Sequence, residues 1–150
     1  MQTALQEAGA HTHIVSKELG VITSADGQDV EVDKSFLTVA SVIYDAVFIP
    51  GGQQSIEALM RQGDAIHFVN EAFKHCKPIA ATDAGVDMLL VADMRDVAVA
   101  SAKSKGKLCV EHGVVTSRNA SAMDASIQHF IEAISQHRHW GRAQKEQVPA

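Results

Sequence analysis

Apolar residues in this 150-residue sequence form two patterns: short uninterrupted runs, and positions spaced three and four residues apart. Short continuous apolar runs, as in parallel strands that are buried on both faces, occupy residues 44–50, 78–82 and 114–117. Apolar residues three and four positions apart predict amphipathic helices over residues 65–75 and 123–136. Strands and helices that alternate in this way form a mostly parallel sheet with helices on both of its faces. We therefore predict a single α/β domain over residues 1–150, in which residues 137–150 form a polar C-terminal tail.

Weaker patterns predict the elements between these segments. Helices are predicted over residues 2–10, 55–61 and 86–91, a loop or short helix over 36–42, and short strands over 13–16, 20–23, 30–32, 97–100 and 107–111. Asp26 and Gly27 favour a tight β-hairpin between two of these short strands. Asp64 directly precedes a long helix, where its side chain is predicted to act as the N-cap.

Composition narrows the class of protein. Hydrophobic residues make up 46% of the sequence but aromatic residues only 5%, so we expect a core of Ala, Val, Ile and Leu. The net charge of −5 argues against a nucleic-acid partner, because such a partner requires a basic surface. Lys103, Lys105 and Lys107 form one short basic cluster, which we interpret as a solvated loop.

Three further features of the sequence bear on where the protein is located. No apolar run approaches the length of about 18 residues that crosses a bilayer, so no membrane partner is predicted. The N-terminus shows no basic region followed by an apolar stretch, and no signal peptide is predicted. Cys76 and Cys109 belong to no disulfide or zinc pattern, so we expect a reducing, cytoplasmic compartment.

Ligands of an open α/β sheet bind beyond the carboxyl ends of its strands, and two predicted turns lie there. The first turn contains Gly51 and Gly52, whose bare backbone lets N–H groups approach an anion or an oxyanion closely. The same glycines also suit a plain strand-to-helix turn, and the turn taken alone favours that structural interpretation. Its spacing is not that of a dinucleotide-binding loop.

The second turn is a strand-to-helix elbow formed by Thr82, Asp83, Ala84 and Gly85. Small residues around such an elbow expose one side chain at a helix N-terminus, where the helix dipole activates a cysteine or serine nucleophile. Asp83 occupies the exposed position. Because aspartate is a poor nucleophile for acyl transfer and a good N-cap, we predict that Asp83 caps the next helix and does no chemistry. No catalytic residue is therefore predicted.

Other reactive side chains give weaker patterns. The eight histidines include His137 and His139, but no third ligand lies at a metal-site spacing, so no metal site is predicted. Asp83 and His112 would form a dyad if their two strand ends met, and the sequence leaves their distance open. Cys109 lies in an apolar segment and is interpreted as a small buried hydrophobic residue.

Three segments resemble the PfpI-like branch of the class I glutamine amidotransferase-like superfamily, namely residues 44–52, 77–81 and 113–117. The resemblance implies a flavodoxin-like three-layer sandwich. Enzymes of this branch use an elbow cysteine, usually with a histidine and an acidic partner. Asp83 stands where that cysteine is expected, and Ala84 stands where many members have the histidine. The resemblance therefore implies the degenerate site of a pseudoenzyme.

Residues 63–80 and 137–150 are similar to the C-terminal domain of large-subunit haem catalases, and this resemblance covers nearly the whole chain. In that family a flavodoxin-like domain without the amidotransferase nucleophile is appended to a catalase core. The haem and its ligands belong to the core, so no cofactor is expected in this chain. Implied partners are the catalase core, sister subunits of a homo-oligomer and, because the wider superfamily includes holdase chaperones, unfolded client proteins.

The family domain begins with a strand before its first helix, whereas this sequence starts inside the helix. That strand is central in a flavodoxin-like sheet, and a sheet without it exposes backbone edges. We expect either a fragment or another segment or subunit that fills the position.

The favoured function is a non-catalytic accessory domain of a large-subunit catalase, an enzyme that removes hydrogen peroxide under oxidative stress. Its expected role is stabilising, assembly-related or chaperone-like. One alternative is a stand-alone PfpI-like hydrolase, deglycase or lyase, which would have to work through Asp83, Cys109 or a histidine. Another is a module that binds an anion at Gly51 and Gly52 without turnover.

Overall fold

The structure, a computed structural model, describes residues 1–24, 27–94, 96–101, 108–142 and 145–150. The main sheet contains, in spatial order, β5 (Val47–Ile49), β6 (Ile79–Thr82), β8 (Val114–Ser117) and β7 (Cys109–Glu111). Two smaller sheets pair β1 (Val15–Ser16) with β4 (Lys34–Ser35) and β2 (Gly20–Thr23) with β3 (Asp29–Val32). The α-helices are α1 (Gln2–Glu7), α2 (Gln53–Leu59), α3 (Gly63–Lys74), α4 (Gly85–Val91) and α5 (Met123–Ser135); short 3-10 turns are η1 (Ser41–Ile43), η2 (Ala120–Ala122) and η3 (Lys145–Gln147).

The main sheet confirms the expected mostly parallel architecture. β5, β6 and β8 run parallel, and β7 is an antiparallel strand at the edge. All three long apolar runs of the sequence contain these parallel strands. The register places Ala80 of β6 between Phe48 of β5 and Val115 of β8, so small and large side chains alternate across the sheet.

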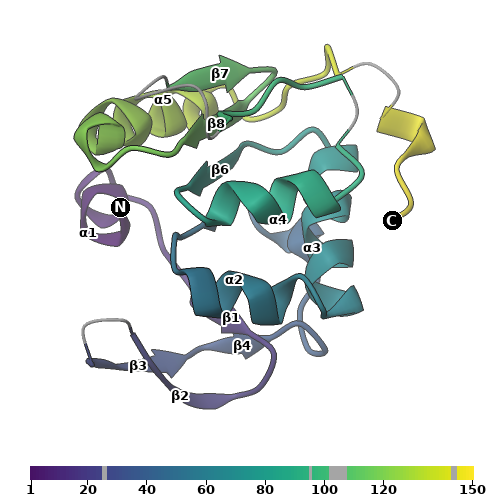
Figure 1. The fold of residues 1–150 in the computed structure, drawn as a ribbon. Helices are drawn as coiled ribbons and strands as arrows, with labels where there is room; N and C mark the ends of the chain where they lie inside the picture. Colours follow the sequence, from purple (N-terminus) through teal and green to yellow (C-terminus); the bar gives the residue numbers. More distant parts are fainter. Residues whose placement is uncertain (25–26, 95, 102–107, 143–144) are drawn as a thin grey trace.

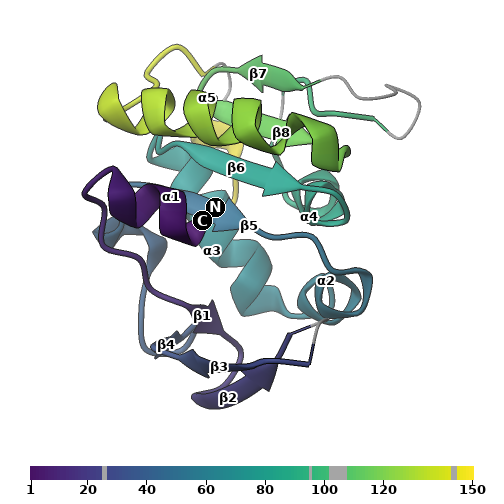
Figure 2. The same ribbon diagram turned by 90° about the vertical axis from the view of Figure 1, so that its left-hand side faces the viewer.

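Side chains on the two faces of this sheet enter separate cores. Ile79 and Val114 pack with residues of α2, α3 and α4, whereas Ala80 and Val115 pack with Leu5 of α1 and with α5. Figures 1 and 2 show α1 and α5 on one side of the sheet and α2, α3 and α4 on the other. The fold is therefore the three-layer, flavodoxin-like α/β sandwich that was expected.

The prediction of a strand over residues 97–100 is wrong. This segment pairs with no neighbouring strand in the described residues, and side chains of β7 and β8 bind its backbone. Glu111 accepts from the backbone N–H of Ala98, and Thr116 Oγ1 accepts from that of Ala100 at 2.9 Å. Side chains thus take the place of a strand ladder at Ala98 and Ala100, and this β-like sequence stays irregular.

The predicted N-cap at Asp64 is also wrong. The first long helix, α3, begins one residue earlier, at Gly63, and its N-cap position is Gln62. Asp64 lies in the first turn of α3, where its negative charge still complements the helix dipole.

The predicted pairing of the two strands is confirmed, because β2 and β3 pair antiparallel with Gly20 opposite Val32. The prediction of a tight two-residue turn is wrong, because the ladder ends at Thr23 and Asp29 and five residues, 24–28, join the strands. Asp26 and the lysines 103, 105 and 107 lie outside the described residues. Among the described residues, every helix is too short or too polar to cross a bilayer.

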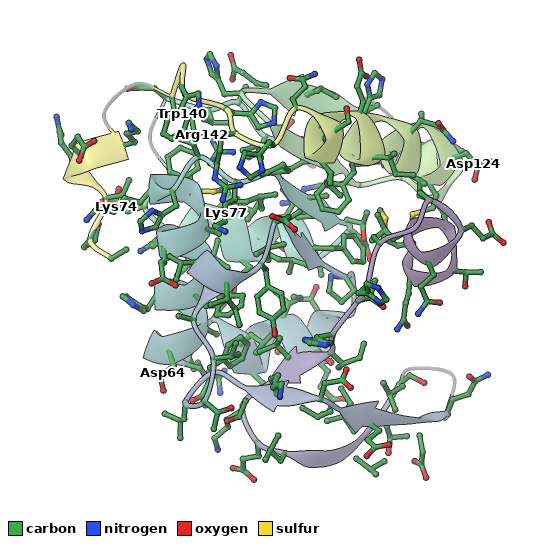
Figure 3. All side chains as sticks on the ribbon, turned by 180° about the vertical axis from the view of Figure 1, so that it is seen from behind. Asp64, Lys74, Lys77, Asp124, Trp140 and Arg142 are labelled. Carbon is green, nitrogen blue, oxygen red and sulfur yellow. The ribbon has the colours of Figure 1, made fainter. Side chains whose placement is uncertain are left out.

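The C-terminal tail does not lie free on the surface. Arg142 is buried and donates to the carbonyl oxygens of His112, Phe73 and Lys77 at 2.9, 2.8 and 2.7 Å. Its guanidinium carbon also lies 4.5 Å from the centre of the Phe73 ring. Val148 enters the core next to α3. Figure 3 shows Arg142 beside Lys77 in the interior, while Trp140 points outward.

Lys77 fixes the loop before β5 to the start of β6. Its buried ammonium group donates to the carbonyl oxygens of Val42, at 2.7 Å, and of Tyr44. Burial is the main cause that lowers the pKa of Lys77, followed by the positive charge of Arg138; the charges of Asp45 and Glu71 act in the opposite direction.

The strands do not form one continuous sheet. β1 pairs only with β4 and β5 only with β6 among the described residues, so the sheet is interrupted between β1 and β5. Figure 2 shows β1 and β4 below the main sheet.

Candidate functional site

The elbow between β6 and α4 keeps the sharp backbone of a nucleophile turn. Asp83 has a φ of 49°, in the left-handed region that costs a non-glycine residue about 1–2 kcal/mol. The turn is held by the N–H of Asp83, which donates to Ser117 O at 2.7 Å, and by the N–H of Val86, which donates to Asp83 O at 3.2 Å. Asp83 is exposed, whereas Ala84 and Gly85 are buried. The geometry therefore presents one side chain to solvent, and that side chain is a carboxylate.

The two turns singled out in the sequence lie against each other. A Cβ atom on Gly85 would lie 2.6 Å from the carbonyl oxygen of Ile49, so only glycine lets α4 approach the end of β5. A Cβ atom on Gly51 would lie 2.9 Å from Cβ of Asp83 and 3.4 Å from its Oδ2. The Asp83 carboxylate thus occupies the space above Gly51. Gly52, with a φ of 134°, forms the N-cap of α2.

Asp83 does not cap α4, and that prediction is wrong. The helix begins at Gly85, Ala84 occupies the N-cap position, and no side chain accepts from its first N–H groups. The reason is the left-handed backbone at Asp83, which turns its side chain toward Gly51 instead of along the helix axis.

Sequence reasoning missed Arg118, which is the cation beside the elbow. Its Nη2 makes an ion pair of 2.5 Å with Oδ1 of Asp87, and its Nε donates to Ala100 O at 2.9 Å. Nη1 donates to the backbone carbonyl of Asp83 at 3.3 Å. The position of Arg118 directly after the last parallel strand is the signal that could have identified it. The Arg118 guanidinium therefore stabilises the turn through the carbonyl of Asp83 and neutralises the charge of Asp87.

The structure separates Asp83 from His112, so the dyad does not form. Asp83 follows β6 at the end where Thr82 pairs with Ser117. His112 precedes β8 at the opposite end, next to Gly113, whose carbonyl accepts from the N–H of Ile79. The two residues therefore lie at opposite edges of the sheet.

Cys109 is half-buried in the edge strand β7, and its thiol donates to Ala98 O at 3.2 Å. Burial, and then the charge of Glu111, raises the pKa of this thiol. A raised pKa keeps the sulfur protonated at neutral pH, which is the opposite of what a nucleophile needs.

The side chain of His139 also has a structural role. Its Nε2 lies 3.1 Å from the carbonyl oxygen of Ala133, which can only accept, so Nε2 carries the proton. Gly113 lies against the ring, because a Cβ atom there would be 2.1 Å from Cδ2 of His139. Within the part of the chain that the structure describes, no three His, Cys, Asp or Glu side chains come together as metal ligands.

Two hollows have no residue of the elbow (82–85) in their lining, although Ile49 and Pro50, which contact Gly85, line the second. One, of about 360 Å³, is bounded by residues 36–40 and by Asp64, His67, Phe68 and Glu71 of α3. Glu71 is already engaged, because its Oε2 accepts from the N–H and the hydroxyl of Ser41 at 2.7 and 2.9 Å. The other, of about 140 Å³, runs between β1 and β5.

Residues 1–144 match the family described as the C-terminal domain found in long catalases. The chain belongs to this family. Over 149 residues the domain is 36% identical to Catalase HPII of Mycobacterium avium, a match that covers 97% of the chain and 20% of that protein. Over 139 residues it is 35% identical to Catalase-2 of Bacillus subtilis (strain 168), covering 93% of the chain and 18% of that protein. The chain spans about a fifth of the length of the curated relatives it matches.

Solved structures confirm the type of fold. A ThiJ/PfpI domain protein from Brachyspira murdochii superposes with a TM-score of 0.78 at 18% identity, covering 90% of the catalase C-terminal domain and 86% of that chain. Oxidized DJ-1 from Toxoplasma gondii superposes with a TM-score of 0.72 at 21% identity, covering 90% and 84%. At these identities the likeness shows the fold alone, and it agrees with the resemblance to the PfpI-like branch.

Proposed function

We propose that this domain is a non-catalytic accessory part of a long catalase and that it stabilises the assembled enzyme. The observation that carries the proposal is the elbow, where the exposed side chain is Asp83 and the neighbouring cation, Arg118, is bound to Asp87. An acyl-transfer site needs a nucleophile within hydrogen-bond reach of a base. Peroxide chemistry and haem binding then belong to the other four-fifths of a long catalase.

The β2–β3 hairpin supports a docking role. All four residues of β2 are exposed, and Leu19 and Val21 keep 62% and 64% of their surface in contact with solvent. Figure 1 shows this hairpin extending away from the helices and the main sheet. Clustered apolar surface of this kind marks interaction sites. In our proposal the hairpin contacts the catalase core of the assembled homo-oligomer.

Both cysteines are free, which supports the reducing, cytoplasmic compartment that we propose for the parent enzyme.

The stabilising role is tested by fusing the chain to the haem core of Catalase-2 from Bacillus subtilis in place of that enzyme's own C-terminal domain. The half-life of peroxide-consuming activity at raised temperature is compared with that of the core alone. We expect a longer half-life in the fusion, and we expect Val21→Lys to shorten it. Leu90→Lys, at an exposed apolar position of α4, is the matched control and should have no effect. Equal half-lives for the core and the fusion would sink the stabilising role.

The non-catalytic part of the proposal has a separate test. The chain and its Asp83→Asn variant are assayed for esterase, peptidase and glyoxal-consuming activity. We expect no turnover by either protein. Activity in the wild type that Asp83→Asn abolishes would overturn the proposal and establish a PfpI-like enzyme.

A further inference from the structure

The larger of the two hollows lies beside α3 and has the size of a ligand site. Its volume of about 360 Å³ falls within the range of about 300–1,000 Å³ that is typical of small-molecule pockets. Residues 36–40 form one wall, and Asp64, His67, Phe68 and Glu71 of α3 form the other. These α3 residues are three and four positions apart, so they share one face of the helix. One face of α3 therefore places two carboxylates in the wall of a single hollow.

Aromatic rings form the apolar part of this wall. The rings of Phe36 and Phe68 pack edge to face, with their centres 5.5 Å apart. Phe68 is buried and Phe36 is half-buried against the core, so the protein holds both rings in place. An alkyl chain that packs on these rings gains apolar contact without first having to order them.

The negative charge in the hollow has no basic side chain to balance it. No lysine or arginine is among the described residues that line it. Glu71 binds Ser41 through Oε2 and its charge also acts on buried Lys77, but two carbonyl oxygens already bind the Lys77 ammonium group. Asp64 is exposed in the first turn of α3, where the helix N-terminus supplies only about half a positive charge. The hollow therefore carries a net negative charge while His67 is neutral.

Carboxylates beside aromatic rings favour one ligand chemistry, a cationic group on an apolar stem. The side chains of lysine and arginine have this form, and they bury the stem while the charged head stays at a polar surface. A head of this kind makes a charge-assisted hydrogen bond with a carboxylate. An anion would be repelled by Asp64 and Glu71, and a neutral ligand would gain nothing from their charge.

Exposed apolar side chains beside the hollow indicate that a protein surface covers it. Leu37, in the wall, keeps 79% of its surface exposed, and Ile43, in the turn η1 that follows the wall, keeps 69%. β4 directly precedes Phe36 and connects this region to the β2–β3 hairpin. In Figure 3, Asp64 lies at the end of the molecule that carries the hairpin. A small molecule in the hollow would leave Leu37 and Ile43 in water, whereas a protein surface would cover them.

We propose that the hollow between residues 36–40 and α3 binds a lysine or arginine side chain that a partner protein presents within an apolar surface. The charged head pairs with Asp64 and Glu71, and the alkyl stem packs on Phe36 and Phe68. The partner to which we commit is the catalase core, because the hollow adjoins the hairpin that contacts the core in our proposal. The choice of partner thus rests on the proposed function, whereas the chemistry of the site does not.

The chemistry of the site is tested with benzylamine and with benzyl alcohol, a neutral compound of nearly the same shape. Each is titrated into the chain at about pH 8, where histidine is ordinarily neutral, and binding is followed by the NMR shifts of amides 36–40. We expect benzylamine to bind at least about 3-fold more tightly, because the carboxylates attract only the cation. Equal affinities for the two compounds would overturn the proposal.

Asp64→Asn removes the negative charge and keeps the shape of the side chain. It should weaken the binding of benzylamine by about 3-fold and leave that of benzyl alcohol unchanged. Asp124→Asn is the matched control, because Asp124 is also an exposed carboxylate in the first turn of a helix, and Figure 3 shows it well separated from Asp64. An equal loss of benzylamine affinity in both variants would also contradict the assignment.

The choice of partner is tested in the fusion with the haem core of Catalase-2. Asp64→Lys should shorten the half-life of the fusion, because it places a second cation opposite the one that the core presents. Asp124→Lys should not, although it too places a cation in the first turn of a helix.

The outcomes separate this inference from the accessory role. If the fusion outlives the core alone and Asp64→Lys leaves its half-life unchanged, the core does not occupy the hollow, and the inference fails while the accessory role stands. If the fusion does not outlive the core, the accessory role fails and the core is overturned as the partner. The benzylamine titration then decides separately whether the hollow is a cation site.

Discussion

Asp83 holds a left-handed backbone in the middle of a tightly hydrogen-bonded turn. Asn and Gly tolerate this region, whereas a β-branched residue does not. We expect Asp83→Asn to change the free energy of unfolding by less than about 0.5 kcal/mol. Asp83→Val should lower it by about 1–2 kcal/mol, measured by urea denaturation. Equal stability of the Asn and Val variants would show that the turn is not strained.

His139 makes stability depend on pH. Burial lowers its pKa; the hydrogen bond with Ala133 O opposes this, and the charges of Arg142 and His112 lower it further. The unfolded chain takes up a proton at the ordinary histidine value of about 6.5, while the folded chain still resists protonation. Protonation therefore favours the unfolded state, and stability falls as the pH drops below that value.

The measurement is the urea midpoint at pH 7.5 and pH 5.5. We expect the loss of stability between these values to be smaller in His139→Phe than in the wild type. His137→Phe, which changes an exposed histidine of the same tail, is the control and should behave as the wild type does. The same pH dependence in all three proteins would contradict the assignment to His139.

At the scale of elements, the contact between β5 and α4 depends on Gly85. A Cβ atom there would lie 2.6 and 2.8 Å from the carbonyl oxygens of Ile49 and Pro50, which belong to the backbone and cannot move aside easily. Gly85→Ala should therefore destabilise the domain, by about 1–3 kcal/mol as for other overpacked sites. Gly63→Ala is the matched control, because Gly63 also begins a helix and a Cβ atom added there would meet no other atom within 4 Å. The control should be neutral or stabilising in thermal unfolding; a similar loss in both variants would refute the close approach.

Long, regular apolar runs predicted several elements well, and the short exposed strand β2 also has its expected bounds, 20–23. β8 has the expected bounds, and α3 and α5 differ from the expected helices by no more than two residues at either end. The prediction of a strand over residues 97–100 failed because the side chains of Glu111 and Thr116 bind its backbone N–H groups in place of a neighbouring strand. Such long-range contacts cannot be inferred from a local sequence pattern. The short strand β4 was missed because two residues carry no measurable alternation.

In the candidate site, too, the features with a local sequence signal were predicted and those that depend on long-range contacts were not. The sequence predicted the elbow and the double-glycine turn, since each is a local signal at the end of an apolar run. Their mutual contact and the separation of Asp83 from His112 depend on strand register, which sequence patterns do not contain. Arg118 and Arg142 were missed because a lone arginine is ordinarily a surface residue.

At the scale of the whole molecule, Arg142 joins the C-terminal tail to two other segments, the connection from α3 to β6 through Phe73 and Lys77 and the turn before β8 through His112. Burial lowers its pKa to about 10, so the side chain stays charged at neutral pH and makes charged hydrogen bonds to three carbonyls. Arg142→Met leaves these carbonyls without their donor, at a cost of about 1–3 kcal/mol for each group. We expect a loss of at least about 3 kcal/mol in the free energy of unfolding.

Arg138→Met is the control for this prediction, because Arg138 bonds only to its neighbour His137 among the contacts described for its side chain. It should lower stability only slightly in the same urea titration. A small effect of Arg142→Met would show that the tail does not depend on this residue.

The interruption of the sheet between β1 and β5 also determines how the molecule comes apart. Among the described residues, only side-chain contacts, such as that between Phe36 and Phe68, hold the segment of β1 to β4 to the main body, so we expect this segment to detach before the β5–β8 sheet unfolds. A cellular protease would then cut first in the N-terminal quarter and leave a resistant remnant.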